Sequence, residues 1–171
     1  SQWLEDIKKK RGETTETDIS NVNRGGELVD QRTLVNQVIQ NIREGEKIDI
    51  NKLGLLTNSL EDIDPHDFEF FVAKILVKRG YQTELTRLVG DDGVDVLAYD
   101  NSQRRIAIQC KRYKKPVGPA IIREMKGAQK LNQCEASVVV TTSRFTPEAQ
   151  RTASQLNVGL IDGDDIVQIL I

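Results

Sequence analysis

Three side chains suited to metal-assisted phosphoryl chemistry fall in two neighbouring predicted strands. Along residues 105–113 a period of two places Gln109 and Lys111 on the same face of the strand. The preceding strand, 94–99, carries Asp95 directly after a glycine-flanked acidic turn. If the two strands pair as a hairpin, an acid, an amide and an ammonium group converge at one place.

Hydrolysis of a phosphodiester needs a divalent cation, oxygen ligands that hold it, and a group that assists the attacking water. Asp95 would supply the anionic ligand, Gln109 its side-chain carbonyl and Cys110 its backbone carbonyl. Lys111 would orient the water and stabilise the developing charge. The alternative is a solvated sheet face, because charged residues usually stay at the surface.

The charge pattern around these residues favours the site over that alternative. Residues 104–130 hold nine Lys or Arg against one acid, a net charge of +8, whereas residues 63–103 hold four bases against eight acids, a net charge of −4. An acidic cluster followed by a basic one suits a metal ion beside a phosphate backbone. Candidate phosphate contacts in the basic segment are Arg112, Lys114, Lys115 and Arg123. As in other charge runs, they could instead form a solvated face.

Period and capping signals predict an α/β fold, with a mixed sheet flanked by helices on both faces. The expected helices are 27–43, the segment that starts at Asp64-Pro65 and stops at Gly80, 119–131, 147–156 and a short terminal one. The expected strands are 81–88, 94–99 and 105–113 as an antiparallel meander joined by a turn at 100–102, then 136–141 and 158–161 in a right-handed parallel crossover.

Two parts of the chain are expected to differ in character. Residues 1–62 would form an N-terminal extension with one amphipathic helix, beginning with a loosely ordered arm over about residues 1–26. Residues 63–171 would form the α/β domain. The extension is expected to pack on that domain, mediate dimerisation, or join another domain or partner protein. Because the chain starts at Ser1 rather than Met, the possibility that it is a fragment of a longer protein stays open.

Several other polar residues have two interpretations each. Thr142, Ser143 and Arg144 follow a buried strand, where α/β sheets often bind ligands, although hydroxyls there also cap turns. His66 suits an exposed or capping position in a first helical turn, and its alternative is an approach to a phosphate. Asp91 and Asp92 are expected to form a turn rather than bind metal.

Composition excludes some classes of protein. No segment has the roughly 20 apolar residues that a membrane span needs, and the N-terminus is too polar for a secretion signal, so a cytoplasmic protein without a membrane partner is expected. Cys110 and Cys134 are then free thiols.

Several spaced motifs resemble the Mrr-type catalytic domain of the PD-(D/E)XK restriction-endonuclease superfamily. The resemblance covers about residues 64–171. The matching runs are Asp67-Phe68-Glu69, Gly80-Tyr81, Asp91 to Val96, Ile108 to Tyr113, Val138 to Ser143 with Phe145-Thr146 and Ala149, and Leu160 to Gly163.

That resemblance implies a restriction endonuclease-like core, Mg²⁺-dependent cleavage of DNA with Mn²⁺ as an alternative ion, and defence against foreign or modified DNA. It assigns Asp95 to the metal-binding acid and Lys111 to the catalytic lysine. Gln109 falls where the wider superfamily carries Glu or Asp. Glu69 matches an acid at the edge of the site and is expected to be a catalytic residue and a second carboxylate ligand of the metal ion, because Gln109 is neutral. A solvated helix residue is the alternative for Glu69.

Three functions therefore compete at this stage. The first is a metal-dependent endodeoxyribonuclease of restriction or anti-phage type, for which a homodimer is plausible because two cuts in a duplex need two sites. The second is a nuclease of the Holliday-junction-resolvase kind, specific for branched DNA. The third is a non-catalytic module that binds DNA or a partner.

Overall fold

A computed structural model describes residues 24–54, 60, 62–86 and 93–171 of the chain. The expected arm falls largely on residues that are not described, as do Asp91 and Asp92. The described elements follow the expected order. They are α3 Arg24–Arg43, a 3-10 helix Ile50–Leu53, α4 Pro65–Lys78, β1 Gln82–Leu85, β2 Val96–Tyr99, β3 Arg105–Lys111, α5 Pro119–Leu131, β4 Ala136–Thr141, α6 Pro147–Leu156, β5 Gly159–Ile161 and α7 Gly163–Ile169.

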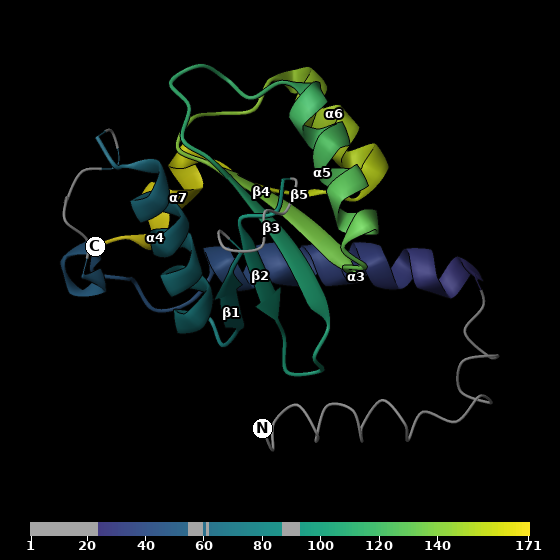
Figure 1. Cartoon of the computed structure of the whole chain (residues 1–171), viewed down its shortest axis with the longest axis horizontal. Helices are drawn as coiled ribbons and strands as arrows, with labels where there is room; N and C mark the ends of the chain where they lie inside the picture. The colour runs from purple at the N-terminus through teal and green to yellow at the C-terminus, as the bar shows by residue number, and fades with distance from the viewer. Residues whose placement is uncertain (1–23, 55–59, 61, 87–92) are drawn as a thin grey trace.

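The strands form a mixed five-stranded sheet in the order β1-β2-β3-β4-β5 (Figure 1). The first three strands are antiparallel, with Val96 opposite Ile108, and the last three are parallel, with Gln109 beside Val139. Both the predicted antiparallel meander and the predicted parallel arrangement of the later strands are confirmed. Strand β3 lies at the centre of the sheet, where its two neighbours run in opposite directions.

Local capping explains where α4 begins and ends. The Asp64 side chain accepts hydrogen bonds from the backbone N–H groups of His66 at 2.8 Å and Asp67 at 3.2 Å, and Pro65 occupies the first turn. These hydrogen bonds lower the pKa of the Asp64 carboxyl. Gly80, at φ 95°, turns the chain out of the helix toward β1. The predicted N-cap and stop are therefore confirmed.

The hairpin between β2 and β3 closes over a wider turn than the predicted 100–102. Asp100 accepts hydrogen bonds from the backbone of Ser102 and of Arg104, both at 2.9 Å, and from the Arg104 guanidinium at 2.7 Å. Gln103 takes a positive φ of 63° to complete the loop. The Asp100 side chain thus organises a five-residue turn that aligns the two strands.

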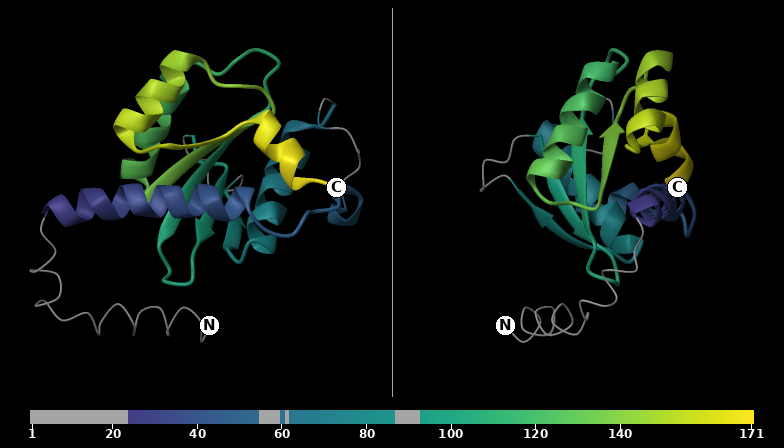
Figure 2. Two further views of the ribbon diagram at one scale, coloured as in Figure 1. Left: turned by 180° about the vertical axis from the view of Figure 1, so that it is seen from behind. Right: turned by 90° about the vertical axis from the view of Figure 1, so that its right-hand side faces the viewer.

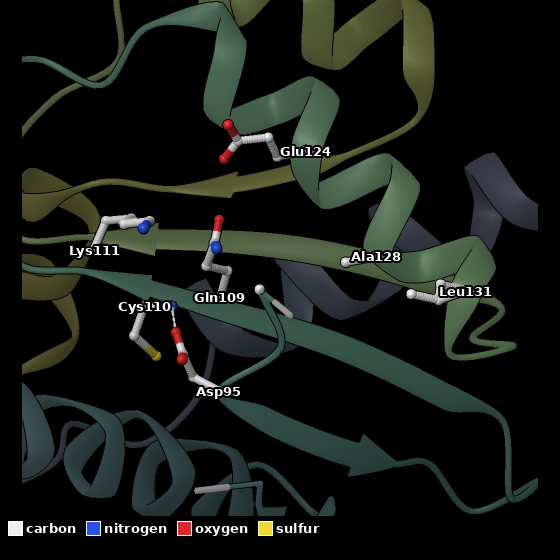
Figure 3. Close-up of a pocket in the computed structure, with 8 residues that line it drawn as sticks. Asp95, Gln109, Cys110, Lys111, Glu124, Ala128 and Leu131 are labelled. Atoms are coloured by element: carbon white, nitrogen blue, oxygen red, sulfur yellow. Dashed lines mark hydrogen bonds between the residues drawn. The ribbon is translucent and has the colours of Figure 1, made fainter. Parts of the chain in front are cut away.

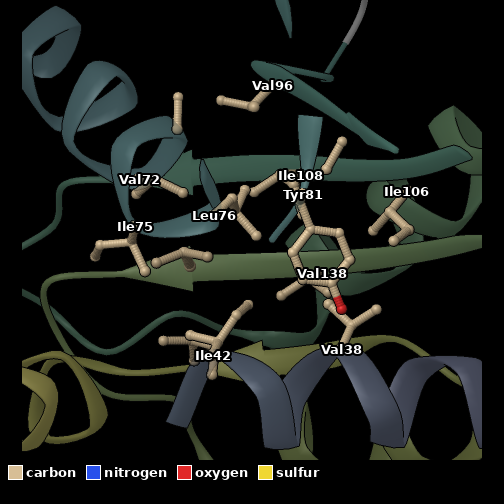
Figure 4. Close-up of a cluster of buried hydrophobic side chains, with 14 of the residues drawn as sticks. Val38, Ile42, Val72, Ile75, Leu76, Tyr81, Val96, Ile106, Ile108 and Val138 are labelled. Atoms are coloured by element: carbon tan, nitrogen blue, oxygen red, sulfur yellow. The ribbon is translucent and has the colours of Figure 1, made fainter. Parts of the chain in front are cut away.

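The sheet separates two hydrophobic cores. One core, under α3, α4 and α7, contains Ile106 and Ile108 of β3, and the other, under α5 and α6, contains Ala107. Figure 4 shows side chains of α3, α4 and the strands meeting in the first core. The predicted period-two division of β3 and the predicted cover on both faces are therefore confirmed.

Helix α3 packs on the face of the sheet opposite α5 and α6 (Figure 2). Val38 is completely buried in the first core. The backbone of β5 comes so close that a Cβ on Gly159 would lie 2.7 Å from the Ile39 side chain. The helix expected in the extension therefore shares a core with the sheet. No helix in the described part of the chain is both long and apolar enough to cross a bilayer.

The buried position of Val38 predicts a stability effect. Val38→Ala should lower the free energy of unfolding by about 2 kcal/mol, because it removes buried methyl groups and leaves a cavity. Urea unfolding followed by circular dichroism measures this change. Gln37→Ala, on the exposed side of the same helix, should change it by less than about 0.5 kcal/mol. Equal effects of the two substitutions would contradict the packing of α3 in the core.

Candidate active site

An open cleft of about 610 Å³ lies between α5 on one side and, on the other, the end of β3 and the segment that leads into β2 (Figure 3). The structure brings Asp95, Gln109 and Lys111 to this cleft from two adjacent stretches of backbone, as the alternation pattern predicted. The other described residues that line the cleft are Gly93, Cys110, Glu124, Ala128 and Leu131.

Asp95 is tied to β3 through both its backbone and its side chain. Its N–H donates to the Ile108 carbonyl at 2.9 Å, and its carboxylate accepts from the Cys110 N–H at 2.7 Å. Burial raises the pKa of the Asp95 carboxyl, an effect that the Cys110 hydrogen bond and the nearby Lys111 charge only reduce. A cation bound beside this carboxylate would therefore stabilise its charged form.

Gln109 is 5% exposed, and its buried Oε1 atom has no hydrogen-bond partner among the described residues. A Cβ on Gly93 would lie 3.3 Å from Gln109 Nε2 and 3.6 Å from the Ala128 Cβ. The small residues at 93 and 128 thus make room for the amide beside the cleft. A buried acceptor without a partner lowers the stability of the fold. Such an acceptor is typical of a site that binds a ligand.

Lys111 is the last residue of β3, and β4 fixes its position. Its carbonyl accepts hydrogen bonds from Thr141 Oγ1 at 2.6 Å and from the Thr142 N–H at 3.2 Å. The ammonium lies 5.6 Å from the centre of the exposed Tyr113 ring, a cation–π distance. The lysine is therefore held at the strand end with its charge in the cleft.

Glu69 lies on α4 and is not among the residues that line the cleft. Its charge acts on Cys110: burial first, then the Asp95 and Glu69 carboxylates, raise the pKa of this thiol well above its ordinary value. The thiol consequently stays protonated at neutral pH. Both Cys110 and Cys134 are free.

The donor set decides whether a divalent cation fits here. Across the described ranges, no group of three or more His, Cys, Asp or Glu side chains is close enough to hold a metal ion. An ion that prefers carboxylate and carbonyl oxygens still has the Asp95 carboxylate and the orphaned Gln109 Oε1 in one cleft. The residues therefore fit a hard cation such as Mg²⁺ better than a zinc-type ion.

Two loops beside the cleft are joined through their backbones. Val117 donates to the Arg144 carbonyl at 2.7 Å, and Thr146 donates to the Val117 carbonyl at 3.0 Å. The Thr142 and Ser143 hydroxyls donate to backbone carbonyls of the 112–118 loop at 3.3 and 3.5 Å. Both hydroxyls therefore connect the two loops, instead of capping the turn after β4 as the alternative interpretation expected. The exposed cations of this region are Arg112, Lys114, Lys115, Arg123 and Arg144.

Glu124 is a cleft residue that the sequence patterns did not single out. It lies on α5, one turn before Ala128 and two turns before Leu131, so the three form one face of the helix. In the sequence it was only the one acid in a basic segment, and helical spacing to Ala128 offered no chemical signal.

A central strand that presents an amide and a lysine to a cleft, beside an acid on the segment that leads into β2, is the arrangement that the sequence predicted for a phosphodiester-cleaving α/β site. Comparison with known proteins agrees with this class. The family model of the Mrr catalytic domain, described as a restriction endonuclease, matches residues 60–170. The chain belongs to this family, and its fold is the restriction endonuclease-like core.

A curated relative is the type IV methyl-directed restriction enzyme EcoKMrr of Escherichia coli (strain K12), which is 30% identical over 125 residues. The match covers 68% of this chain but only 41% of that enzyme. Two solved structures are also similar. The DNA modification-dependent restriction endonuclease AspBHI is 20% identical, with a TM-score of 0.47 over 82% of this chain and 35% of the other. The MspJI restriction endonuclease in complex with a 27-mer oligonucleotide is 21% identical, with a TM-score of 0.45 over 74% and 34%.

The environment of Asp95 predicts a pH-dependent effect on stability. Because its folded-state pKa is raised, ionisation of Asp95 costs stability as the pH rises through that value, and the cost is absent below the ordinary value of 3.8. In chelator, Asp95→Asn should therefore unfold at a higher temperature than the wild type near pH 7.5. This advantage should vanish near pH 4.

Thermal unfolding followed at both pH values measures this difference. Asp62→Asn, a change at an exposed carboxylate, serves as the control and should show no such pH-dependent gain. A destabilised Asp95→Asn variant at neutral pH would show that the carboxylate supports the fold rather than a ligand site.

Proposed function

We propose that this chain is the catalytic part of a divalent-cation-dependent endodeoxyribonuclease that acts in restriction or anti-phage defence. The observation that carries the proposal is the buried Oε1 of Gln109, which has no hydrogen-bond partner among the described residues and belongs to a side chain that lines the cleft with Asp95 and Lys111. Such a donor set suits Mg²⁺, with Mn²⁺ as a substitute. The substrate is DNA, and the proposed nuclease domain spans residues 63–171, preceded by the extension 1–62.

Each residue has a proposed role. Asp95 and Gln109 hold the cation with their side-chain oxygens, and Cys110 contributes its backbone carbonyl. A cation held by these residues would neutralise charge on the scissile phosphate and make water a better nucleophile. Lys111 orients the attacking water and stabilises the negative charge that develops on the phosphate. Glu69 adds negative potential from the α4 side of the strand.

The cations next to the cleft are proposed to hold the DNA backbone. Arg112, Lys114 and Lys115 follow the catalytic lysine directly along the chain, and their side chains are exposed. Arg123 on α5 and the Thr142 to Arg144 segment would add further phosphate contacts. Contacts of this kind give affinity without sequence preference and position the phosphate at the cleft.

Plasmid cleavage tests the proposal. Purified protein should nick or cut plasmid with Mg²⁺ or Mn²⁺ and not in chelator. Lys111→Ala and Asp95→Ala should each lower the rate by at least about 100-fold, because each removes stabilisation of charge in the transition state. Lys78→Ala, at an exposed lysine of α4, should leave the rate unchanged. The assay uses methylated and unmethylated plasmid, and undiminished cutting by the two site variants would refute the assignment.

Salt dependence tests the DNA-binding loop. The double substitution Lys114→Ala with Lys115→Ala should weaken binding to duplex DNA. It should also reduce the slope of log K against log salt by about 0.9 for each phosphate contact removed. Fluorescence anisotropy in chelator at several salt concentrations measures both quantities without cleavage. An unchanged slope, equal to that of Lys78→Ala, would show that these lysines do not touch phosphate.

A further inference from the structure

Glu124 is an acid on the α5 wall of the cleft, which it lines together with Gln109 and Lys111. Figure 3 shows its side chain on the α5 side of the cleft, with the amide group of Gln109 directed toward that helix. Ala128, one turn further along α5, lines the same wall and leaves the space beside Glu124 open. The carboxylate thus reaches the cleft from the side opposite Asp95.

The fold itself makes no use of this charge. The residues three and four positions away on the helix are Ala120, Ile121, Gly127 and Ala128, so no cation can form an ion pair with Glu124 along α5. Glu124 also lies beyond the first helical turn, in which α5 has no acid. Among the described residues Glu124 takes part in no hydrogen bond or ion pair.

The net charge of the side chains that line the cleft indicates what Glu124 contributes. Among the described residues, the charged side chains that line it are Asp95, Lys111 and Glu124. The charges of Asp95 and Lys111 cancel, so Glu124 gives this described part of the lining its net negative charge, which favours a divalent cation. The neutral Gln109 amide cannot change this balance, and Glu69 does not line the cleft.

We propose that Glu124 is a positioning residue of the cation site and supplies the second negative charge that Gln109 lacks. The inference rests on the proposed function. A cleft of about 610 Å³ has room for ordered waters between the carboxylate and an ion held by Asp95 and Gln109. Mg²⁺ in proteins usually keeps several of its waters. Glu124 would accept hydrogen bonds from such waters, while Asp95 and Gln109 Oε1, which has no hydrogen-bond partner among the described residues, would hold the ion itself.

Calorimetric titration of Mg²⁺ and Mn²⁺ into the full chain without DNA tests this inference directly. Glu124→Gln should weaken cation binding about 10-fold, as loss of an outer-shell partner commonly does. Glu148→Gln, at an exposed acid of α6, is the matched control and should bind like the wild type. The combination of Glu124→Gln with Gln109→Glu should recover most of the lost affinity, because it returns the missing charge from the other wall.

The outcomes separate this inference from the proposed function. If the wild type binds the cation, Asp95→Asn abolishes binding, and Glu124→Gln binds like the wild type, the role of Glu124 is refuted while the nuclease proposal stands. A Glu124→Gln variant whose only change is tighter DNA binding in chelator also refutes it. A wild-type chain that binds no divalent cation overturns both. Circular dichroism of each variant confirms that the fold is retained.

Discussion

The hydrogen bond from the Cys110 N–H to the Asp95 carboxylate connects the end of one strand to the centre of the sheet. Without it, only backbone hydrogen bonds would tie Asp95 to its neighbours, and its carboxylate would have no fixed direction. With the bond at 2.7 Å, the carboxylate is fixed beside the two β3 residues whose side chains enter the cleft. The same contact holds an ionised carboxylate in a partly buried position. The carboxylate is thereby ordered, but its charge loses part of its hydration, which costs free energy.

Strand β3 can carry this site because its alternate side chains lie on opposite faces of the sheet. Ile106 and Ile108 enter the core under α3 and α4, whereas Gln109 and Lys111 reach the cleft on the α5 side. Cys110 contributes to both, because its amide N–H holds the Asp95 carboxylate and its thiol is influenced by the charges of Asp95 and Glu69. A shift of one residue in the register would exchange the two faces and lose core and site together.

Much of this arrangement could be predicted because it follows from local signals. The Asp64-Pro65 pair, Gly80 and the alternation along 105–113 each determine structure within a few residues, and the structure agrees with them. The gathering of Asp95 with Gln109 and Lys111 needed only a hairpin.

The remainder depends on contacts between distant parts of the chain. Glu124 enters the cleft only because α5 folds back over β3 after a long connection. An exposed helical glutamate has no pattern that separates it from an ordinary surface residue. The side of the sheet from which Glu69 acts is likewise set by the packing of α4. The two hydroxyls after β4 proved to join loops, because the loop they contact lies about thirty residues earlier.

The junction of the 112–118 and 142–146 loops is made mainly by main-chain groups. Its geometry therefore does not depend on which side chains the exposed positions carry. Mutations at Arg112, Lys114, Lys115 or Arg144 can accumulate without loosening the support beneath them. The surface beside the cleft can consequently diversify between lineages while the backbone at the end of β3 stays in place.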